Sequence, residues 1–256
     1  MLWNASAIAG YTIKTSDGQT GTVNDLIVED SEWTVHWLSA GTAGWLTGGQ
    51  VLIPVSALGR PDPDAQEVPV NLTMRQIERS PEIDPAQPLA REVEDKIFAY
   101  YRQMSGPGRL AGEPWGSAPI PRVLGALPPG LLGPQGLGPP VLAGLAGAGL
   151  HGLASMIGNG IAATDGDIGH VAEFLIDTLA WEVRFIAVNT AHWWPGERVL
   201  ISPRSVERID TASGVLRLDV DRRKVKDSPP YDMAATADGA FEEQFQTYYG
   251  IRFGRK

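Results

Sequence analysis

Histidine is a residue type that could do chemistry in this chain, because a neutral imidazole is a common metal ligand and proton carrier. The chain has four of them: His36, His151, His170 and His192. No two share the close spacing of metal ligands. His36 alternates with the apolar Val35 and Trp37, so we expect its side chain on the opposite face of a strand. We therefore predict no metal site.

Two other stretches resemble ligand-binding loops but lack essential parts. Residues 164–169 begin like a calcium loop, yet position five would be Gly169 and position twelve Ile176, neither of which supplies a side-chain oxygen. Residues 147–152 fit the G-x-G-x-x-G spacing of dinucleotide sites. Such a site needs a preceding strand and a long following helix, whereas a Pro/Gly-rich segment precedes this one and the glycines of 158–160 soon follow. We predict no cofactor.

Nucleophilic and acid–base catalysis have little support. The chain contains no cysteine and no G-x-S-x-G nucleophile elbow. Glu242 and Glu243 are neighbours on a predicted helix, where adjacent side chains do not face a common point. The basic run within 221–227 could meet RNA or anionic lipid, but its acidic flanks favour a solvated face. We predict no catalytic residues and a protein that is not an enzyme.

The composition fits a folded protein without a nucleic-acid role. The chain has 256 residues, of which 43% are hydrophobic, enough to build a core. It carries 21 Lys+Arg and 30 Asp+Glu, and the resulting net charge of -9 disfavours a protein devoted to nucleic acid. The first residues lack a basic segment followed by an apolar run, so we predict a cytoplasmic location.

The chain repeats itself at a spacing of 148 residues. The stretch Asp17-Gly-Gln-Thr-Gly-Thr-Val23 recurs as Asp165-Gly-Asp-Ile-Gly-His-Val171. Further matches at this spacing pair Gly10 with Gly158, Trp33 with Trp181, Val51-Leu-Ile53 with Val199-Leu-Ile201, and Tyr100-Tyr101 with Tyr248-Tyr249. We infer two homologous units, residues 4–104 and 153–256. Whether they pack as an intramolecular pseudo-dimer stays open, as does the oligomeric state.

Residues 105–152 form the predicted linker between the units. They contain 13 Gly and 9 Pro, which break helices and strands. They also contain nine leucines, so we expect part of the linker to pack on the units, on a partner or on a membrane surface. The apolar stretch 141–164 is long enough to cross a bilayer. However, residues 154–161 align with the opening strand of the first unit, so we predict no transmembrane helix.

Each unit is predicted to be a small antiparallel β-barrel followed by a helix. Asp17-Gly18 and Asp165-Gly166 are hairpin signals. The period of two breaks near residues 24–25 and 172–173, which predicts a β-bulge in each unit. We expect strands at 23–28, 33–37, 51–53 and 68–72, at 171–176, 181–185, 199–201 and 216–220, and helices at 89–101 and 241–249. Pro88 and Asp238 suit the helix starts, and Trp33 and Trp181 are expected in the core.

These residues resemble the PRC-barrel family, named after the cytoplasmic barrel of the photosynthetic reaction centre H subunit. The resemblance rests on Asp17–Leu26, Val51–Pro54 and Arg91–Tyr101, and in the second unit on 165–169, 199–201 and 228–232. It implies two tandem barrels of a type found in many bacterial proteins, used in binding and assembly, with no catalytic residues. The chain differs from the H subunit in having two barrels and no N-terminal transmembrane helix.

Tryptophans at predicted turns are the best candidates for partner binding. Trp193 and Trp194 precede Pro195-Gly196 and align with the Trp45-Leu46 stretch of the first unit. We therefore predict a non-enzymatic protein that binds another protein as an adaptor or assembly factor. Two alternatives stay open. One is association with a photosynthetic or electron-transfer complex at the cytoplasmic face of a membrane, and the other is a small-ligand or enzymatic role at a barrel mouth.

Overall fold

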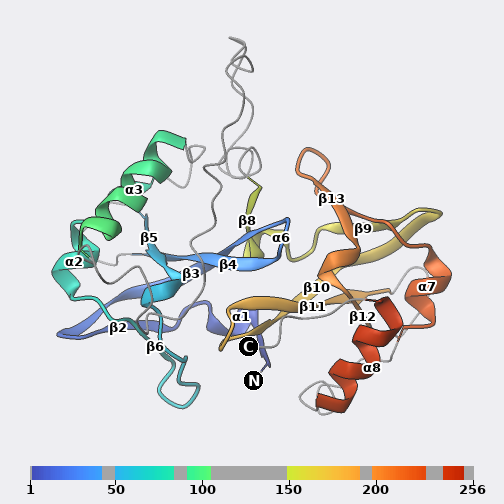
Figure 1. The fold of residues 1–256 in the computed structure, drawn as a ribbon, viewed down its shortest axis with the longest axis horizontal. Helices are drawn as coiled ribbons and strands as arrows, with labels where there is room; N and C mark the ends of the chain where they lie inside the picture. Colours follow the sequence, from blue (N-terminus) through green and yellow to red (C-terminus); the bar gives the residue numbers. More distant parts are fainter. Residues whose placement is uncertain are drawn as a thin grey trace, which may run out of the picture.

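The computed structural model describes residues 2–41, 50–83, 91–104, 149–190, 198–228 and 239–250. The first half contains β1 (Leu2–Asn4), α1 (Ala5–Ile8), β2 (Thr12–Thr15), β3 (Gly18–Glu29), β4 (Thr34–Gly41), β5 (Gln50–Pro54), η1 (Val55–Ala57), β6 (Glu67–Pro69), α2 (Met74–Glu78), β7 (Glu82–Ile83) and α3 (Arg91–Met104). The second half contains β8 (Leu150–Gly152), α6 (Leu153–Met156), β9 (Gly160–Ala163), β10 (Gly166–Asp177), β11 (Glu182–Asn189), β12 (Arg198–Ile201), η2 (Pro203–Ser205), β13 (Val206–Asp210), β14 (Val215–Leu218), α7 (Arg222–Lys226) and α8 (Gly239–Tyr249). The halves form two lobes side by side (Figure 1), and the fold is mainly β, as predicted.

The strands belong to one curled sheet that runs through both lobes. Its main path follows the order β13-β14-β9-β10-β11-β4-β3-β2-β6. The expectation of purely antiparallel strands is wrong, because β6 runs parallel to β2 and β14 runs parallel to β9. The cause is a crossover in each half. After β5 the chain passes through η1 and returns at the far edge, where it runs beside β2 in the same direction.

The local features predicted from sequence are present in the sheet. Thr15 pairs with Gly18 and Ala163 with Gly166, which confirms the two hairpins at the Asp-Gly turns. The pairing of β3 with β4 shifts register between Val23 and Asp25, and that of β10 with β11 shifts at the equivalent place. These shifts confirm the two predicted bulges, which increase local twist and help the sheet to curl.

The strand registers of the two halves are also related by 148 residues. All seven residue pairs between β3 and β4 recur between β10 and β11 at this offset. The parallel pairs recur as well, since Thr12 lies opposite Glu67 and Gly160 lies opposite Val215. Residues that correspond in sequence therefore occupy corresponding places in the two lobes.

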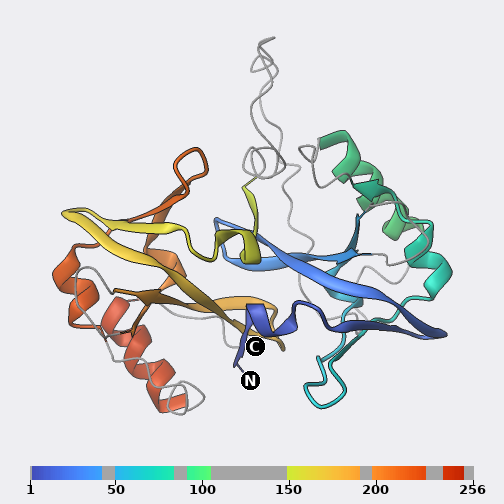
Figure 2. The same ribbon diagram turned by 180° about the vertical axis from the view of Figure 1, so that it is seen from behind.

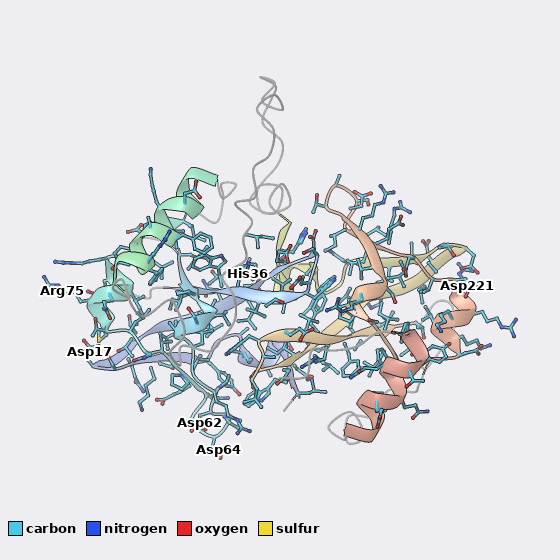
Figure 3. The ribbon with its side chains drawn as sticks, viewed as in Figure 1. Asp17, His36, Asp62, Asp64, Arg75 and Asp221 are labelled. Carbon is cyan, nitrogen blue, oxygen red and sulfur yellow. The ribbon has the colours of Figure 1, made fainter. Side chains whose placement is uncertain are left out.

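The aspartate of each Asp-Gly turn holds a short helix that was not predicted from sequence. Asp17 Oδ1 accepts a hydrogen bond of 2.8 Å from the backbone N–H of Met74, in the first turn of α2. Asp165 Oδ1 accepts the equivalent bond of 2.8 Å from Arg222 N–H in α7. Figure 3 shows Asp17 beside α2 and Asp221, the N-cap residue of α7, at opposite ends of the molecule. Each hairpin is thereby tied to a helix that follows 57 residues later.

The predicted long helices α3 and α8 are present, and each packs on one lobe. Phe98 of α3 contacts Trp37 at a ring-centroid distance of 4.7 Å, and Phe245 of α8 contacts Phe185 at the same distance. Pro88 and Asp238, which were expected at the helix starts, lie outside the described residues, as do the first two residues of the predicted helix 89–101. The two helices therefore cover corresponding surfaces of the sheet (Figures 1 and 2).

A tyrosine fixes each long helix to the neighbouring short helix. The Tyr100 hydroxyl donates to the carbonyl oxygen of Gln76 at 2.6 Å, and the Tyr248 hydroxyl donates to that of Lys224 at 2.7 Å. Lys224 Nζ also lies 3.9 Å from the centre of the Tyr248 ring. Burial raises the pKa of the adjacent Tyr101 hydroxyl well above its ordinary value, so this side chain stays neutral.

The main hydrophobic core is continuous between the halves. It includes Trp33, Val35 and Trp37 from the first half together with Phe174 and Trp181 from the second. Trp33 and Trp181 are buried, as predicted. A smaller cluster lies between the second half of the sheet and α8 and contains Leu175, Phe185, Ala187, Leu200, Phe241 and Phe245.

Candidate functional site at the junction of the halves

The three tryptophans predicted to bind a partner lie outside the described residues, but the strands that flank them are described. Gly41 pairs with Gln50, so the segment with Trp45 joins two neighbouring strands. Asn189 pairs with Arg198 in the same way, on either side of the segment with Trp193 and Trp194. The two tryptophan-containing segments thus connect equivalent strands in the two lobes.

The structure brings another set of residues together where the halves meet, through a reciprocal exchange of strands. β1 pairs with β10 of the second half, with Trp3 opposite Ile176. β8 pairs with β3 of the first half, with His151 opposite Val28. Both pairings follow the same register at the 148-residue offset. Figure 2 shows the dark-blue segment of β1 and α1 and the yellow segment of β8 and α6 at the centre, between the lobes.

A third contact joins the two central strands directly. Thr34 of β4 lies opposite Glu182 of β11. The backbone N–H of Val35 donates to Trp181 O at 2.7 Å, and that of Val183 donates to Trp33 O at 2.8 Å. These bonds are reciprocal, so an approximate two-fold axis passes between the two strands. Each lobe therefore needs backbone from the other to complete its hydrogen bonding.

The tryptophans next to this axis lie in turns and not in strands as predicted. Trp33 and Trp181 have φ angles of 58° and 52°, in the left-handed region. Bulky residues adopt this conformation at a cost, and burial of the indole ring offsets it. Trp33 stacks on Phe174 across the junction at a centroid distance of 6.0 Å. Alternation alone suggested a strand, because it does not reveal where a turn begins.

Two carboxylates at the predicted bulges hold the exchanged segments. Asp25 Oδ1 accepts a 2.8 Å hydrogen bond from Ala154 N–H at the start of α6. Glu173, at the equivalent position, accepts bonds from the backbone N–H and the hydroxyl of Ser6 in α1. Burial raises the pKa of Asp25 to about 6, although hydrogen bonds from backbone N–H groups, Ala154 first among them, act to lower it. The acidic residue at both bulges was a sequence signal that we did not use.

A charged cluster lies on the second-half side of the junction. Arg184 is only 7% exposed and contacts Asp177 and Glu182, each at 3.2 Å. Arg204 lies 4.0 Å from Glu182. Burial acts to raise the pKa of Asp177, but hydrogen bonds from Leu179 N–H and Arg184 outweigh it and lower the pKa. All of these residues belong to the second half, and Asp177 and Glu182 lie opposite Leu2 and Thr34 of the first half in the strand pairing.

The three histidines that the structure describes do not converge on one point. His36, at the position equivalent to Arg184, lies at the centre of the molecule (Figure 3), and burial lowers its pKa against the opposing effect of Glu29 and Glu32. His151 is 3% exposed, and its Nε2 lies 3.1 Å from Asp30 Oδ2. His170 pairs with Asn189 on the sheet, and His192 lies outside the described residues.

The described part of the chain contains no group of three or more His, Asp or Glu residues that could hold a metal ion. Within the same residues, none of the helices has the length and apolar character needed to cross a membrane. What the junction provides is exchanged strands and carboxylate-capped segments that join the two lobes. No protein-family model matches the chain, and a search of curated proteins finds no significant match.

Proposed function

We propose that this protein is a non-enzymatic adaptor or assembly factor that binds another protein at both lobes, through Trp45 in the first and Trp193 and Trp194 in the second. The observation that carries the proposal is the reciprocal exchange of β1 and β8, which fixes two equivalent lobes in one body. A rigid body with two equivalent binding positions suits a partner that is contacted twice.

The spacing of the two positions follows from the central strands. β4 and β11 meet at their first residues, Thr34 and Glu182, and run apart to Gly41 and Asn189. At about 3.3 Å per residue, their far ends lie up to roughly 45 Å from each other. The tryptophan-containing segments follow directly after these ends. A single partner that contacts both segments would reach between these two ends or present two copies of its binding element.

We propose further that the lobes are two tandem PRC-barrel-like units. Support comes from the equal registers of the two halves and from an additional antiparallel bridge between Leu58 and Val70. Leu58 follows β5 and η1 in the chain, and Val70 directly follows β6, which itself pairs with β2. The curled sheet of the first half thus returns toward its own starting strand.

The proposal is tested by site-specific photo-crosslinking in the full chain. A photoreactive phenylalanine analogue replaces Trp45, Trp194 or, as a control, Leu179, which is 70% exposed and belongs to neither segment. We expect adducts to one and the same protein from both tryptophan positions and not from the control. The triple variant, Trp45→Ala with Trp193→Ala and Trp194→Ala, should bind the partner 10²-fold or more weakly than a variant with only Trp45→Ala or only Trp193→Ala and Trp194→Ala. Equal adducts at Leu179, or unchanged binding in the triple variant, would contradict the proposal.

A further inference from the structure

The segment Gly149–Met156, which contains β8 and α6, is called the latch here. Its first four residues belong to the predicted linker, of which residues 105–148 lie outside the described residues. The latch lies on the opposite lobe from the rest of its own half. Leu150 is opposite Glu29 and Gly152 is opposite Ile27 on β3. Leu150, Leu153 and Met156 are buried, at 2%, 0% and 2% exposed. The latch therefore covers both an edge of β3 and part of the core.

Asp25 lies directly beneath the latch. Its Oδ1 accepts bonds from the N–H groups of Ala154 at 2.8 Å and Leu26 at 2.7 Å. A Cβ atom placed on Gly152 would lie only 2.3 Å from Asp25 Oδ2, so the latch backbone is pressed against the carboxylate. Removal of the latch would return this carboxylate to water.

Within the described residues, no cation compensates the carboxylate of Asp25. The residue opposite it on β4 is Ser39, and neither α6 nor the neighbouring α1 contains a titratable side chain. The titratable groups of the latch and of the adjoining part of β3 are His151, Glu29 and Asp30. His151 Nε2 lies 3.1 Å from Asp30 Oδ2.

The equivalent segment on the other lobe, β1 with α1, has different side chains at and around these positions. Trp3 stands in the place of His151 and Thr178 in the place of Asp30. Glu173 stands in the place of Asp25, but it is bonded by a Ser6 hydroxyl as well as a backbone N–H. The two segments are thus matched in backbone and different in titratable side chains.

We propose that the latch is a pH-responsive element that acid holds on β3 and that opens more often as the pH rises, while the β1–α1 segment stays closed. A proton on Asp25 removes the cost of a buried charge that no described cation compensates. Protonation therefore favours the closed latch in acid. Opening exposes the β3 edge at Ile27–Glu29 to pairing by another strand. The inference does not rest on the proposed function.

The size of the effect follows from Asp25. In the closed latch the pKa of this carboxyl is about 6, and with the latch open it returns toward 3.8. Proton linkage between these two values makes the open form about tenfold more populated at pH 8 than at pH 5.

Amide hydrogen exchange of the intact chain, measured by NMR at pH 5 and pH 8, tests the proposal. Ala154 N–H, bonded to Asp25, is compared with Ser6 N–H, its equivalent on the other lobe. After correction for intrinsic rates, we expect the protection of Ala154 to fall about tenfold and that of Ser6 to change less than twofold. Equal changes at the two amides, or none, would overturn the proposal.

Two further measurements separate the role of Asp25 from a general change in stability. In Asp25→Asn the fall in Ala154 protection should disappear, and persistence of the full tenfold fall would exclude Asp25 as its origin. If this variant does not fold, the side-chain carboxyl carbon of Asp25 can be followed in the wild-type protein. A midpoint between pH 5 and 7 supports the proposal, and one below pH 4.5 refutes it.

Discussion

Replacement of Trp33 offers a sharp test of the junction, because this residue combines burial with an unfavourable backbone conformation. Trp33 is 2% exposed, stacks on Phe174 and has a φ of 58°. Trp33→Ala removes a large core side chain, so we expect a loss of about 3–5 kcal/mol in the free energy of unfolding. The left-handed backbone strain remains in this variant, since alanine tolerates that region poorly.

Trp33→Gly separates the two effects. Glycine removes the same side chain but adopts the left-handed region without the roughly 1–2 kcal/mol penalty of other residues. Its greater unfolded-state entropy costs about 0.5–1 kcal/mol in return. We therefore expect Trp33→Gly to be as stable as Trp33→Ala or more stable by up to about 1.5 kcal/mol.

The assay is urea unfolding followed by far-ultraviolet circular dichroism, which does not depend on the tryptophan signal that the change removes. Ala99→Gly on the exposed side of α3 serves as the control, because glycine at an ordinary helix position costs about 1 kcal/mol relative to alanine. The order of alanine and glycine should thus invert between the two sites. A Trp33→Ala protein clearly more stable than Trp33→Gly would refute the assigned turn conformation.

Three further predictions concern capping, pH and helix docking. In urea titrations, Asp17→Ala and Asp165→Ala should each lower the free energy of unfolding by about 1 kcal/mol. The double variant should lose the sum of the two, to within about 0.5 kcal/mol. A clearly larger loss would show that the two caps are coupled. The pKa of Asp25 is raised to about 6 from 3.8, so the folded state keeps this proton to a higher pH than the unfolded state does. The stabilisation of the folded state by this proton is therefore complete below pH 3.8 and is lost as the pH rises through 6. Wild-type stability should fall relative to Asp25→Asn by up to about 3 kcal/mol over this range, and a difference that is constant with pH would contradict the assignment. Tyr100→Phe and Tyr248→Phe should each cost about 1 kcal/mol through a lost hydroxyl bond, with unchanged helix content by circular dichroism; a loss in only one half would show that the two contacts are not equivalent.

Local features were predictable because they depend on nearby residues. The Asp-Gly turns need a backbone conformation that few residues adopt easily, and a break in alternation implies an extra residue in the strand. Both signals were present twice, at the Asp17 and Asp165 turns and at the Asp25 and Glu173 bulges, and the structure contains all four features.

Features that depend on distant residues were not predictable in the same way. β1 and β8 have three residues each, too few to show a periodicity, and their pairing partners lie in the other half. The cap that Asp17 supplies to α2 joins residues 57 positions apart. The parallel pairing of β6 depends on the path of the chain after β5 and not on the side chains of β6. The junction of the two halves, which the sequence did not predict as a site, consists mainly of such long-range contacts.

The contact between Thr34 and Glu182 has a consequence for self-association. If two copies of the second half met about the same axis, Glu182 would face its own counterpart, and directly opposed like charges destabilise a strand pair. With both halves in one polypeptide, a neutral hydroxyl takes that place instead. Because both halves belong to one polypeptide, the two sides of the axis can differ, and this difference favours the mixed pairing over a pairing of identical halves.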